Sequence, residues 1–510
     1  MRRAQFSRTL LVRKSGQKKN HHEGDSSFES HFPDSNRGPT HYECVALPTE
    51  PKWRRSQVIF MTKESCLFLK TGAKVLHFFD IRKYFVKKSA LIVIFLSLML
   101  GISAQTHTHI YNERVRTLRV ARTCLTLMEN ELDGSDPENV LHISFDEMSH
   151  DVHFYTFSVK HMNANWSKES DILSGEYLRG FTTQDITDYE HSINTSREYT
   201  HYRFAFPNPE MVITKSGNYL LTVYEDGDPE NKIAEIRCSV VEPAVKVEAN
   251  VYSHTDIEIN GRYQQMDLSL NTAAIDLKDP NEMHVLVQQN NRTDNEVWLS
   301  RPTYIERNKL RYQQCKDLIF EGGNEYRHFD AFSTYFAGTG IDRVYYEMGD
   351  YHAMLFADEL RTNGYMFNSA DADGRFLVNA ERTQDSDVEA EYMWVHWTLP
   401  MEQPWFDGAL YVGGDLFNNE MGLRNRMQYD PETKCYWLAS LVKQGGYDYQ
   451  YWFVPKSEIS NLKSEISKKT TTTQRVDGSY WQTENEYAVY VYWRPFGARY
   501  DRLVGVSFLR

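Results

Sequence analysis

Val152-His-Phe-Tyr-Thr-Phe-Ser-Val-Lys-His161 is the stretch of sequence that decides the fold of this chain. Apolar side chains recur at every second position from Tyr155 to Val159, and the residues between them are polar. A period of two places successive side chains on opposite faces of a β-strand. The stretch therefore predicts a strand with one buried face.

The same period recurs along much of the chain. Residues 219–223 alternate before Asp226-Gly227, a pair typical of hairpin turns, and residues 233–240 are expected to return as the partner strand. Gly445-Gly446 is expected to join a second strand pair, 436–442 and 447–453. Other strands are predicted at residues 202–206, 245–251, 392–399, 409–412 and 487–493. Short strands separated by turns predict an all-β fold of tandem immunoglobulin-like, or E-set, β-sandwich domains.

Two interruptions divide the predicted strands. Pro243 ends the first group of strands, and the polar, mainly acidic run Glu381–Glu389 ends a less regular middle part. We therefore predict an N-terminal β-sandwich at residues 105–243, a middle β-rich domain at 244–389 and a C-terminal β-sandwich at 390–510.

Lys87 to Gln105, KKSALIVIFLSLMLGISAQ, has the pattern of a secretory signal peptide. Two lysines precede an apolar run, and small residues stand near the expected cut after Ala104. An uncleaved membrane anchor or a buried helix are the alternatives, but the run is shorter than the roughly 20 residues that span a bilayer. The sequence predicts a signal peptide at 87–104 and export from the cytoplasm.

Residues 1–86 precede this signal and have no hydrophobic period. The run Asp34–Glu50 resembles the translation of a transfer-RNA gene, which points to a start codon assigned too far upstream. Met61 is one possible start, and a disordered extension is the alternative. Either interpretation excludes 1–86 from the fold.

Charge and cysteine content limit the function classes. The chain has 57 basic and 70 acidic residues, of which 18 basic and 8 acidic residues precede Gln105. Residues 105–510 therefore contain 39 basic and 62 acidic residues and have a net charge of −23. A nucleic-acid partner is not expected, because such proteins carry a basic patch. Cysteines after residue 104 form no C-x-x-C pair, so a structural zinc site is not expected. Whether Cys124, Cys238, Cys315 or Cys435 form disulfides is left open by the sequence.

Two short motifs contain metal-ligand residue types. Ser369-Ala-Asp-Ala-Asp-Gly374 resembles the first half of a calcium loop, but Ser369 stands at the first position and Ala380 at the twelfth, where acidic ligands are needed. An Asp/Gly turn is the expected structure. His107 and His109 lie two residues apart without a further ligand cluster, and a flexible N-terminus is expected there.

Catalytic signatures are not evident. The chain has no G-x-S-x-G motif and no local cysteine-protease signature, and a glycosidase carboxylate pair depends on separation in space. Tyr447, Tyr449 and Tyr451 would share one strand face, which would stack sugars if exposed and form core if buried. Core is the expected role. No catalytic, cofactor-binding or metal-binding residue is assigned.

Several longer strings resemble the type IX secretion system plug protein family. The resemblance covers nearly all of residues 105–510. The strings that carry it are Tyr111-Asn-Glu-Arg-Val-Arg-Thr-Leu, Ile143-Ser-Phe-Asp-Glu-Met-Ser, Asp188-Tyr-Glu-His-Ser-Ile-Asn-Thr, Tyr199-Thr-His-Tyr, Ser216-Gly-Asn-Tyr, Gly323-Asn-Glu-Tyr-Arg, Phe367-Asn-Ser-Ala-Asp-Ala-Asp-Gly, Asp477-Gly-Ser-Tyr-Trp-Gln-Thr-Glu-Asn-Glu-Tyr and Arg494-Pro-Phe-Gly-Ala-Arg-Tyr-Asp-Arg-Leu.

The resemblance implies a non-enzymatic periplasmic protein that plugs or gates the periplasmic opening of a large outer-membrane β-barrel translocon. It implies no cofactor and no catalytic or metal residue. Two other functions stay open on the residues alone. One is a carbohydrate-binding β-sandwich protein of the periplasm or cell surface that uses tyrosine platforms. The other is a glycan hydrolase, which would need two carboxylates in one cleft.

Overall fold

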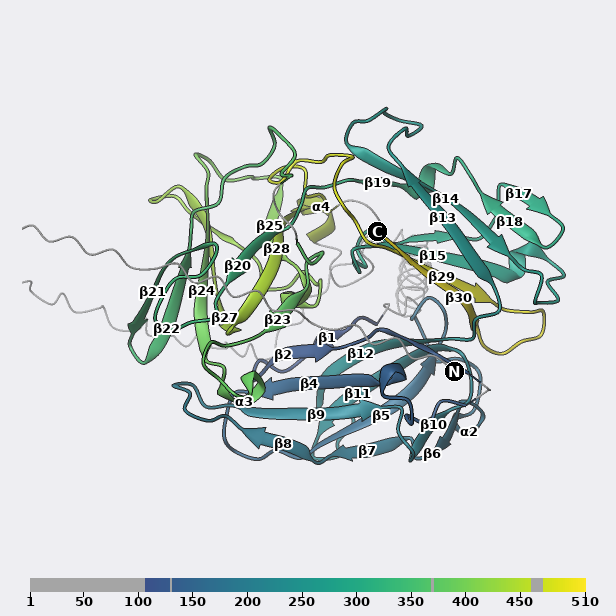
Figure 1. The fold of residues 1–510 in the computed structure, drawn as a ribbon, viewed down its shortest axis with the longest axis horizontal. Coiled ribbons are helices and arrows are strands. Elements are labelled where there is room, and N and C mark those ends of the chain that lie inside the picture. Colours follow the sequence, from purple (N-terminus) through teal and green to yellow (C-terminus); the bar gives the residue numbers. More distant parts are fainter. Residues whose placement is uncertain (1–105, 129–130, 368–370, 460–470) are drawn as a thin grey trace, which may run out of the picture. The chain divides into compact units, whose positions relative to one another are not determined.

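The structure is a computed structural model that describes residues 106–128, 131–367, 371–459 and 471–510, all within one compact unit. Almost all of its regular structure is β-strand, and most neighbouring strands are antiparallel (Figure 1). Strands pair into sheets that pack face to face over shared cores. The predicted all-β sandwich class is confirmed, and the immunoglobulin-like topology stays a prediction.

The first sandwich pairs two sheets over one apolar core. One sheet contains β1 (His109–Ile110), β12 (Lys232–Val241), β11 (Gly217–Glu225), β5 (Tyr155–Met162) and β7 (Thr183–Ile186), with β3 (Cys124–Thr126) beside β12. The other contains β2 (Val115–Val120), β4 (Leu141–Glu147), β9 (Thr200–Phe206) and β8 (Asp188–His191). Side chains of both sheets, including Phe145, Tyr155 and Tyr202, form the core.

The opening stretch of the sequence is strand β5, as predicted. Tyr155, Phe157 and Val159 are buried in the core, as their period requires. The strand begins at Tyr155 rather than at Val152, and Phe154 is exposed. The predicted hairpin between β11 and β12 is also confirmed. Asp226 and Gly227 in its turn have φ values of 55° and 69°, which asparagine, aspartate and glycine tolerate best.

The middle sandwich contains strands from distant parts of the chain. Its first sheet is β13 (Lys246–Tyr252), β14 (Tyr263–Asn271), β18 (Lys309–Tyr312) and β17 (Tyr304–Glu306), with β19 (Ile319–Glu321) beside β14. Its second sheet is β16 (Val297–Leu299), β15 (Met283–Gln289), β29 (Tyr487–Trp493) and β30 (Arg502–Leu509). Both sheets share one core. The last two strands of the chain therefore complete a sheet that begins some 200 residues earlier in the sequence.

The third sandwich has a five-stranded sheet of β21 (Ile341–Glu347), β22 (Asp350–Leu355), β24 (Tyr392–Pro400), β27 (Cys435–Lys443) and β26 (Gln428–Asp430). Its second sheet contains β20 (Arg327–Asp330), β28 (Gly445–Pro455), β23 (Phe376–Val378) and β25 (Gly408–Gly413). Both contribute to one core. The predicted divisions at residues 243/244 and 389/390 stay a prediction.

The predicted pairing of 436–442 with 447–453 is wrong. The two segments form β27 and β28, which belong to different sheets. Gly445 and Gly446 do not make a hairpin turn, because both lie in β28. A Cβ atom at Gly445 would approach the carbonyl oxygen of Leu377 to 2.3 Å. The glycine therefore serves the close approach of β23 to β28.

Helices are few and short in the part of the chain that the structure describes. They are α2 (Ser174–Tyr177), α3 (Ser386–Glu389), α4 (Lys456–Ile459) and the 3₁₀ turns η1 (Pro137–Asn139), η2 (Pro280–Glu282), η3 (Lys316–Leu318) and η4 (Asp415–Phe417). The short strands β6 (Leu178–Gly180) and β10 (Met211–Ile213) pair with each other. Within the described residues, no helix has the length and apolar character needed to cross a membrane.

Several expectations concern the beginning of the chain and the cysteines. The predicted signal peptide and the extension before it lie outside the described residues. The flexible N-terminus expected at His107 and His109 is wrong, because His109 is in β1, which pairs with β12. The hydrogen bond between His109 Nδ1 and Glu420, 2.7 Å long, raises the pKa of this histidine. The four cysteines after residue 104 are free thiols.

Candidate interaction site

A buried ionic cluster joins the first sandwich to the third. Asp146 on β4 is fully buried, and its Oδ2 atom lies 2.6 Å from Nζ of Lys443, at the end of β27. His201, beside Asp146 on β9, contributes Nδ1 at 2.5 Å from Oδ1. The hydroxyl of Tyr392 on β24 donates to Oδ2 at 2.7 Å. Each oxygen of this carboxylate therefore has a charged or polar partner, as a buried charge requires.

The electrostatics of Asp146 favour its ionised form. Burial alone would raise the pKa of the carboxyl, but the ammonium of Lys443 and the hydrogen bond with His201 outweigh burial and hold the pKa below its usual range. Lys443 Nζ also donates to the carbonyl of Asp387 at 2.6 Å and lies 4.1 Å from the ring centre of Tyr199. The ammonium is thus held by strands of both sandwiches and by the segment around α3.

Further contacts extend this junction between the two sandwiches. Arg119 on β2 donates to Asp387 at 2.6 Å. The Tyr199 hydroxyl, from the first sandwich, donates to the carbonyl of Ala390 at 2.8 Å. Residues 146 and 443 are far apart in the sequence, and neither carries a local motif. The sequence analysis therefore missed this cluster. The only signal was Lys443, a charged residue at the otherwise apolar end of β27.

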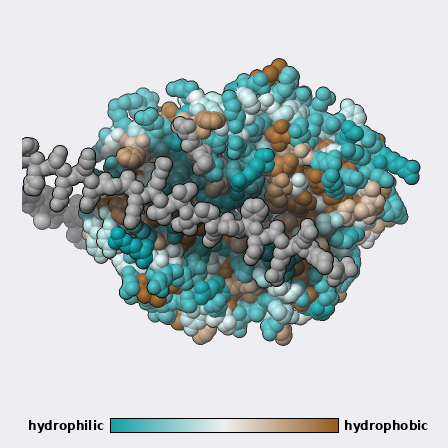
Figure 2. All heavy atoms as spheres, viewed as in Figure 1, coloured by the Kyte–Doolittle hydropathy of each residue, from teal (hydrophilic) through white to brown (hydrophobic). Residues whose placement is uncertain are grey.

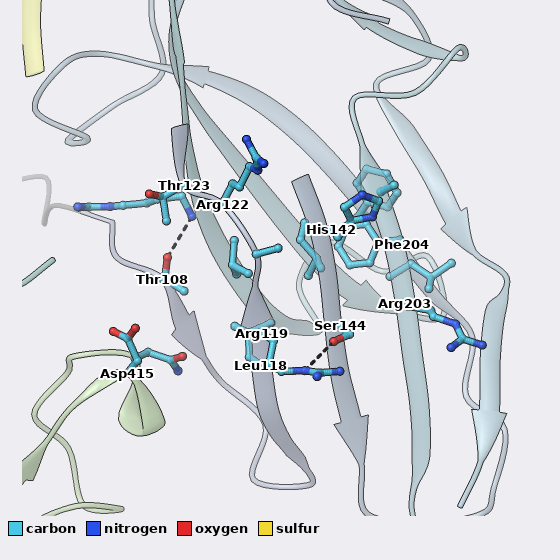
Figure 3. Close-up of a pocket in the computed structure, with 18 of the residues that line it drawn as sticks. Thr108, Leu118, Arg119, Arg122, Thr123, His142, Ser144, Arg203, Phe204 and Asp415 are labelled. Carbon is cyan, nitrogen blue, oxygen red and sulfur yellow. Dashed lines mark hydrogen bonds between the residues drawn. The ribbon is translucent and has the colours of Figure 1, made fainter. Parts of the chain in front are cut away.

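A cavity of about 1310 Å³ lies beside the junction. One wall is the outward face of β2, β4 and β9, where Arg119 donates to the Ser144 hydroxyl at 3.2 Å (Figure 3). Other walls come from η4 and from β29 and β30. Four of the five arginines of the wall have acidic partners: Arg119 with Asp387, Arg203 with Asp188, Arg122 with Glu138 and Arg375 with Glu486. The fifth, Arg237, donates to the carbonyl oxygen of Thr106.

Exposed apolar side chains gather in the loops of the third sandwich. Hydrophilic residues cover much of the face in Figure 2, which is also hollowed, and hydrophobic residues form separate patches. Six large apolar side chains of the described residues are at least 80% exposed: Tyr335, Met348, Phe367, Phe406, Leu423 and Phe496. The first five lie between strands of the third sandwich, and Phe496 lies between β29 and β30. Exposed aromatic and methionine side chains are typical of interface anchors.

The tyrosines of β28 are core residues, as expected. Tyr447, Tyr449 and Tyr451 are buried in the core of the third sandwich. The hydroxyls of Tyr449 and Tyr451 both donate to Oδ2 of Asp358, at 2.7 and 2.6 Å. Arg327 binds the other oxygen of Asp358 at 2.6 Å. These rings cannot stack on a sugar, because no face of the ladder reaches solvent.

Replacing Tyr451 with phenylalanine is expected to lower the free energy of unfolding by about 1.5–3 kcal/mol, the usual cost of a lost hydrogen bond to a charged group. Denaturant unfolding would measure the change. Tyr335→Phe is the matched control, because that tyrosine is exposed, and its stability should equal that of the parent. A loss of glycan affinity in Tyr451→Phe with unchanged stability would contradict the core role.

No group of three or more His, Cys, Asp or Glu side chains in the described part of the chain is arranged to hold a metal ion. Of the calcium-like motif, residues 368–370 lie outside the described residues. Asp371 accepts a hydrogen bond from the backbone of Tyr326, and burial raises the pKa of its carboxyl to about 7. Asp371 therefore serves to fix the loop to β20.

The chain resembles known proteins in two comparisons. Residues 130–242 match the family model of the type 9 secretion system plug protein, first domain. The crystal structure of a hypothetical protein from Parabacteroides merdae ATCC 43184 is 35% identical and superposes with a TM-score of 0.73. That match covers 80% of this chain and 99% of the other. No curated protein matches.

The family match agrees with the sequence strings quoted above. The family match covers most of the first sandwich, from β4 to β12, and the likeness to the solved structure extends over all three sandwiches. Proteins of this family are components of a secretion system. The chain therefore belongs to the type IX secretion system plug protein family and has a role related to type IX secretion.

Proposed function

We propose that this protein plugs or gates the periplasmic opening of the large outer-membrane β-barrel translocon of the type IX secretion system, without catalysing a reaction. The match of residues 130–242 to the first domain of the plug protein carries this proposal. Export by the segment 87–104 and a periplasmic location at the outer membrane belong to the same proposal, because a plug at that opening must reach the periplasm.

The junction between sandwiches supports a blocking role. A plug must resist deformation, and the contacts of Asp146, Lys443 and Tyr392 tie the first sandwich to the third through buried groups. The middle sandwich contacts the first through Asp501, which accepts from the backbone of Ala164 at 2.8 Å. It contacts the third through Arg375 and Glu486, 2.7 Å apart. Each sandwich is therefore fixed to the other two.

We further propose that the exposed loops of the third sandwich contact the translocon. Stable interfaces bury roughly 1,200–2,000 Å² and derive most of their energy from a few anchors. Met348, Phe406 and Leu423 are suitable anchors, because these large apolar residues are at least 80% exposed and can lose apolar surface to a partner.

A tagged pull-down from gently solubilised outer membranes would test both proposals. The tagged protein should bring down the translocon barrel, identified by mass spectrometry. Met348→Asp, Phe406→Asp and Leu423→Asp should lower its recovery, because each places a charge at a desolvated contact. Stability should not change, since these side chains are exposed.

Phe496→Asp is the matched control, because Phe496 is equally exposed but lies on the middle sandwich. It should recover as much barrel as the parent chain. If Phe496→Asp alone lost the barrel, the interface would be assigned to the middle sandwich instead. Recovery of the protein without any barrel, from membranes that contain it intact, would contradict the plugging role itself.

The carbohydrate-binding function is not favoured by any observation, since the tyrosines on which it depended are buried.

A further inference from the structure

Two histidines meet on the outward face of the five-stranded sheet of the third sandwich. His352 on β22 and His396 on β24 are half-buried, and their Nδ1 and Nε2 atoms lie 3.0 Å apart. Their neighbours Ala353 and Val395 point the other way into the core. Both imidazoles therefore face away from the core, on adjacent strands.

A thioether shares this face. β22 and β24 run parallel, and the register places Met354 directly beside His396 and His352 directly beside Trp394. Met354 is half-buried and lies two residues after His352, so both side chains point to the same face. Two imidazoles and one thioether therefore occupy three neighbouring positions of the sheet surface.

Ring stacking holds the two imidazoles in place. The ring of Tyr345, on the edge strand β21, stacks on His352 with centres 5.0 Å apart and planes 10° apart. The His352 and His396 rings stack with centres 5.3 Å apart. The Tyr345 hydroxyl donates to the sulfur of Met354 at 3.9 Å. Ligands held by their neighbours lose little freedom when an ion binds.

The contact between the two rings favours the neutral form of His396. A hydrogen bond between two imidazole nitrogens contains one hydrogen, donated by one ring and accepted by the other. Burial lowers the pKa of His396, and a positive charge on His352 would lower it further. A neutral imidazole keeps a lone pair on one nitrogen, which is the form that binds metals.

We propose that His352, His396 and Met354 form a binding site for one copper ion. Imidazole nitrogens bind such ions at about 2.0–2.1 Å, so two nitrogens about 3 Å apart can share one ion after a small rotation of the rings. The bridging hydrogen moves to the other nitrogen of its ring, and both rings stay neutral.

The donor set and the order of metal affinities together favour copper. Imidazole ligands suit zinc, copper, nickel and iron, whereas a soft thioether suits copper(I) and zinc, so copper and zinc fit both kinds of ligand. Copper(II) also has the highest affinity of the first-row divalent ions at a given nitrogen site. The carboxylate of Asp350, on the same face, already binds Arg197 at 2.7 Å through each oxygen. Water would fill the remaining positions around the ion.

Titration of the purified full-length protein with copper(II) chloride, followed by calorimetry, would test the site. The chain has 18 histidines, so weaker copper binding elsewhere is expected and the comparison must be between variants. His352→Gln and His396→Gln should each weaken the tightest binding by at least about tenfold, because even loss of a supporting contact to a ligand costs 10–100-fold. Met354→Leu should weaken binding of copper(I) more than that of zinc.

His254→Gln is the matched control, because this exposed histidine lies between β13 and β14, outside the site, and the tightest binding should be unchanged. Electron paramagnetic resonance of the copper(II) form gives a second test that needs no variant, since two bound nitrogens should split the signal. Unchanged copper affinity in both histidine variants, or a spectrum without two equatorial nitrogens, would overturn the proposal. Zinc bound as tightly as copper would overturn the assignment to copper.

Discussion

Replacing Lys443 with alanine is expected to lower the free energy of unfolding by about 3–5 kcal/mol, the cost of leaving one partner of a buried ion pair uncompensated. Asp146 would lose the ammonium 2.6 Å from its Oδ2 atom while it stays fully buried. The carbonyl of Asp387 would lose its donor as well. Urea unfolding, followed by tryptophan fluorescence, would measure the change.

Lys434→Ala is the matched control. Lys434 is an exposed lysine just before the start of β27, and its Nζ atom lies 2.7 Å from Oε2 of Glu402. Exposed ion pairs contribute little to the free energy of unfolding. Its unfolding midpoint should equal that of the parent. The double variant Asp146→Leu, Lys443→Met should be more stable than Lys443→Ala, because it removes both charges together. Equal midpoints for Lys443→Ala and Lys434→Ala would show that Lys443 does not hold Asp146.

The same pair predicts a pH dependence with a defined sign. The pKa of Asp146 is lower in the folded protein than the unfolded value of about 3.9. The stability that this carboxylate contributes is therefore complete above that value and is lost as the pH falls through the folded pKa. The difference between the parent and Lys443→Ala should accordingly shrink in acid.

Removing residues 487–510 is expected to prevent the middle sandwich from folding. The deletion takes away β29 and β30, and with them five core side chains: Tyr487, Val489, Val491, Trp493 and Val504. Burial of one such side chain contributes about 1.5–3 kcal/mol, so the loss is about 7–15 kcal/mol, as large as the whole stability of a typical domain. Hydrogen exchange should show that β15 loses its protection.

Deleting Arg510 alone is the control for this truncation. Arg510 lies beyond β30, and its side chain pairs with Asp373 at 2.6 Å without entering the core. Protection of β15 should then be retained. The core strands β5 and β11 of the first sandwich should stay protected in both deletions, because neither pairs with β29 or β30. Full protection of β15 in the chain that ends at residue 486 would contradict the observed pairing.

Local sequence determined the strands themselves. The alternation from Tyr155 to Val159 and the turn residues Asp226 and Gly227 predicted β5 and the β11–β12 hairpin, because both signals act within a few residues. Alternation in residues 487–493 also predicted β29. The burial of Tyr447, Tyr449 and Tyr451 followed from the same period. The family resemblance likewise came from the sequence alone, because it rests on strings of consecutive residues.

Only the tertiary structure decided which strands meet. Nothing near β29 specifies its partner β15, and the two glycines that begin β28 indicated a hairpin with β27, although each strand pairs elsewhere. Asp146 and Lys443 are 297 residues apart, and their chemistry exists only because burial brings them together. Strand formation depends on neighbouring side chains, whereas pairing depends on shape and buried area across the whole chain. The junction, the exposed loops and the His352–His396 pair could therefore be found only in the folded protein.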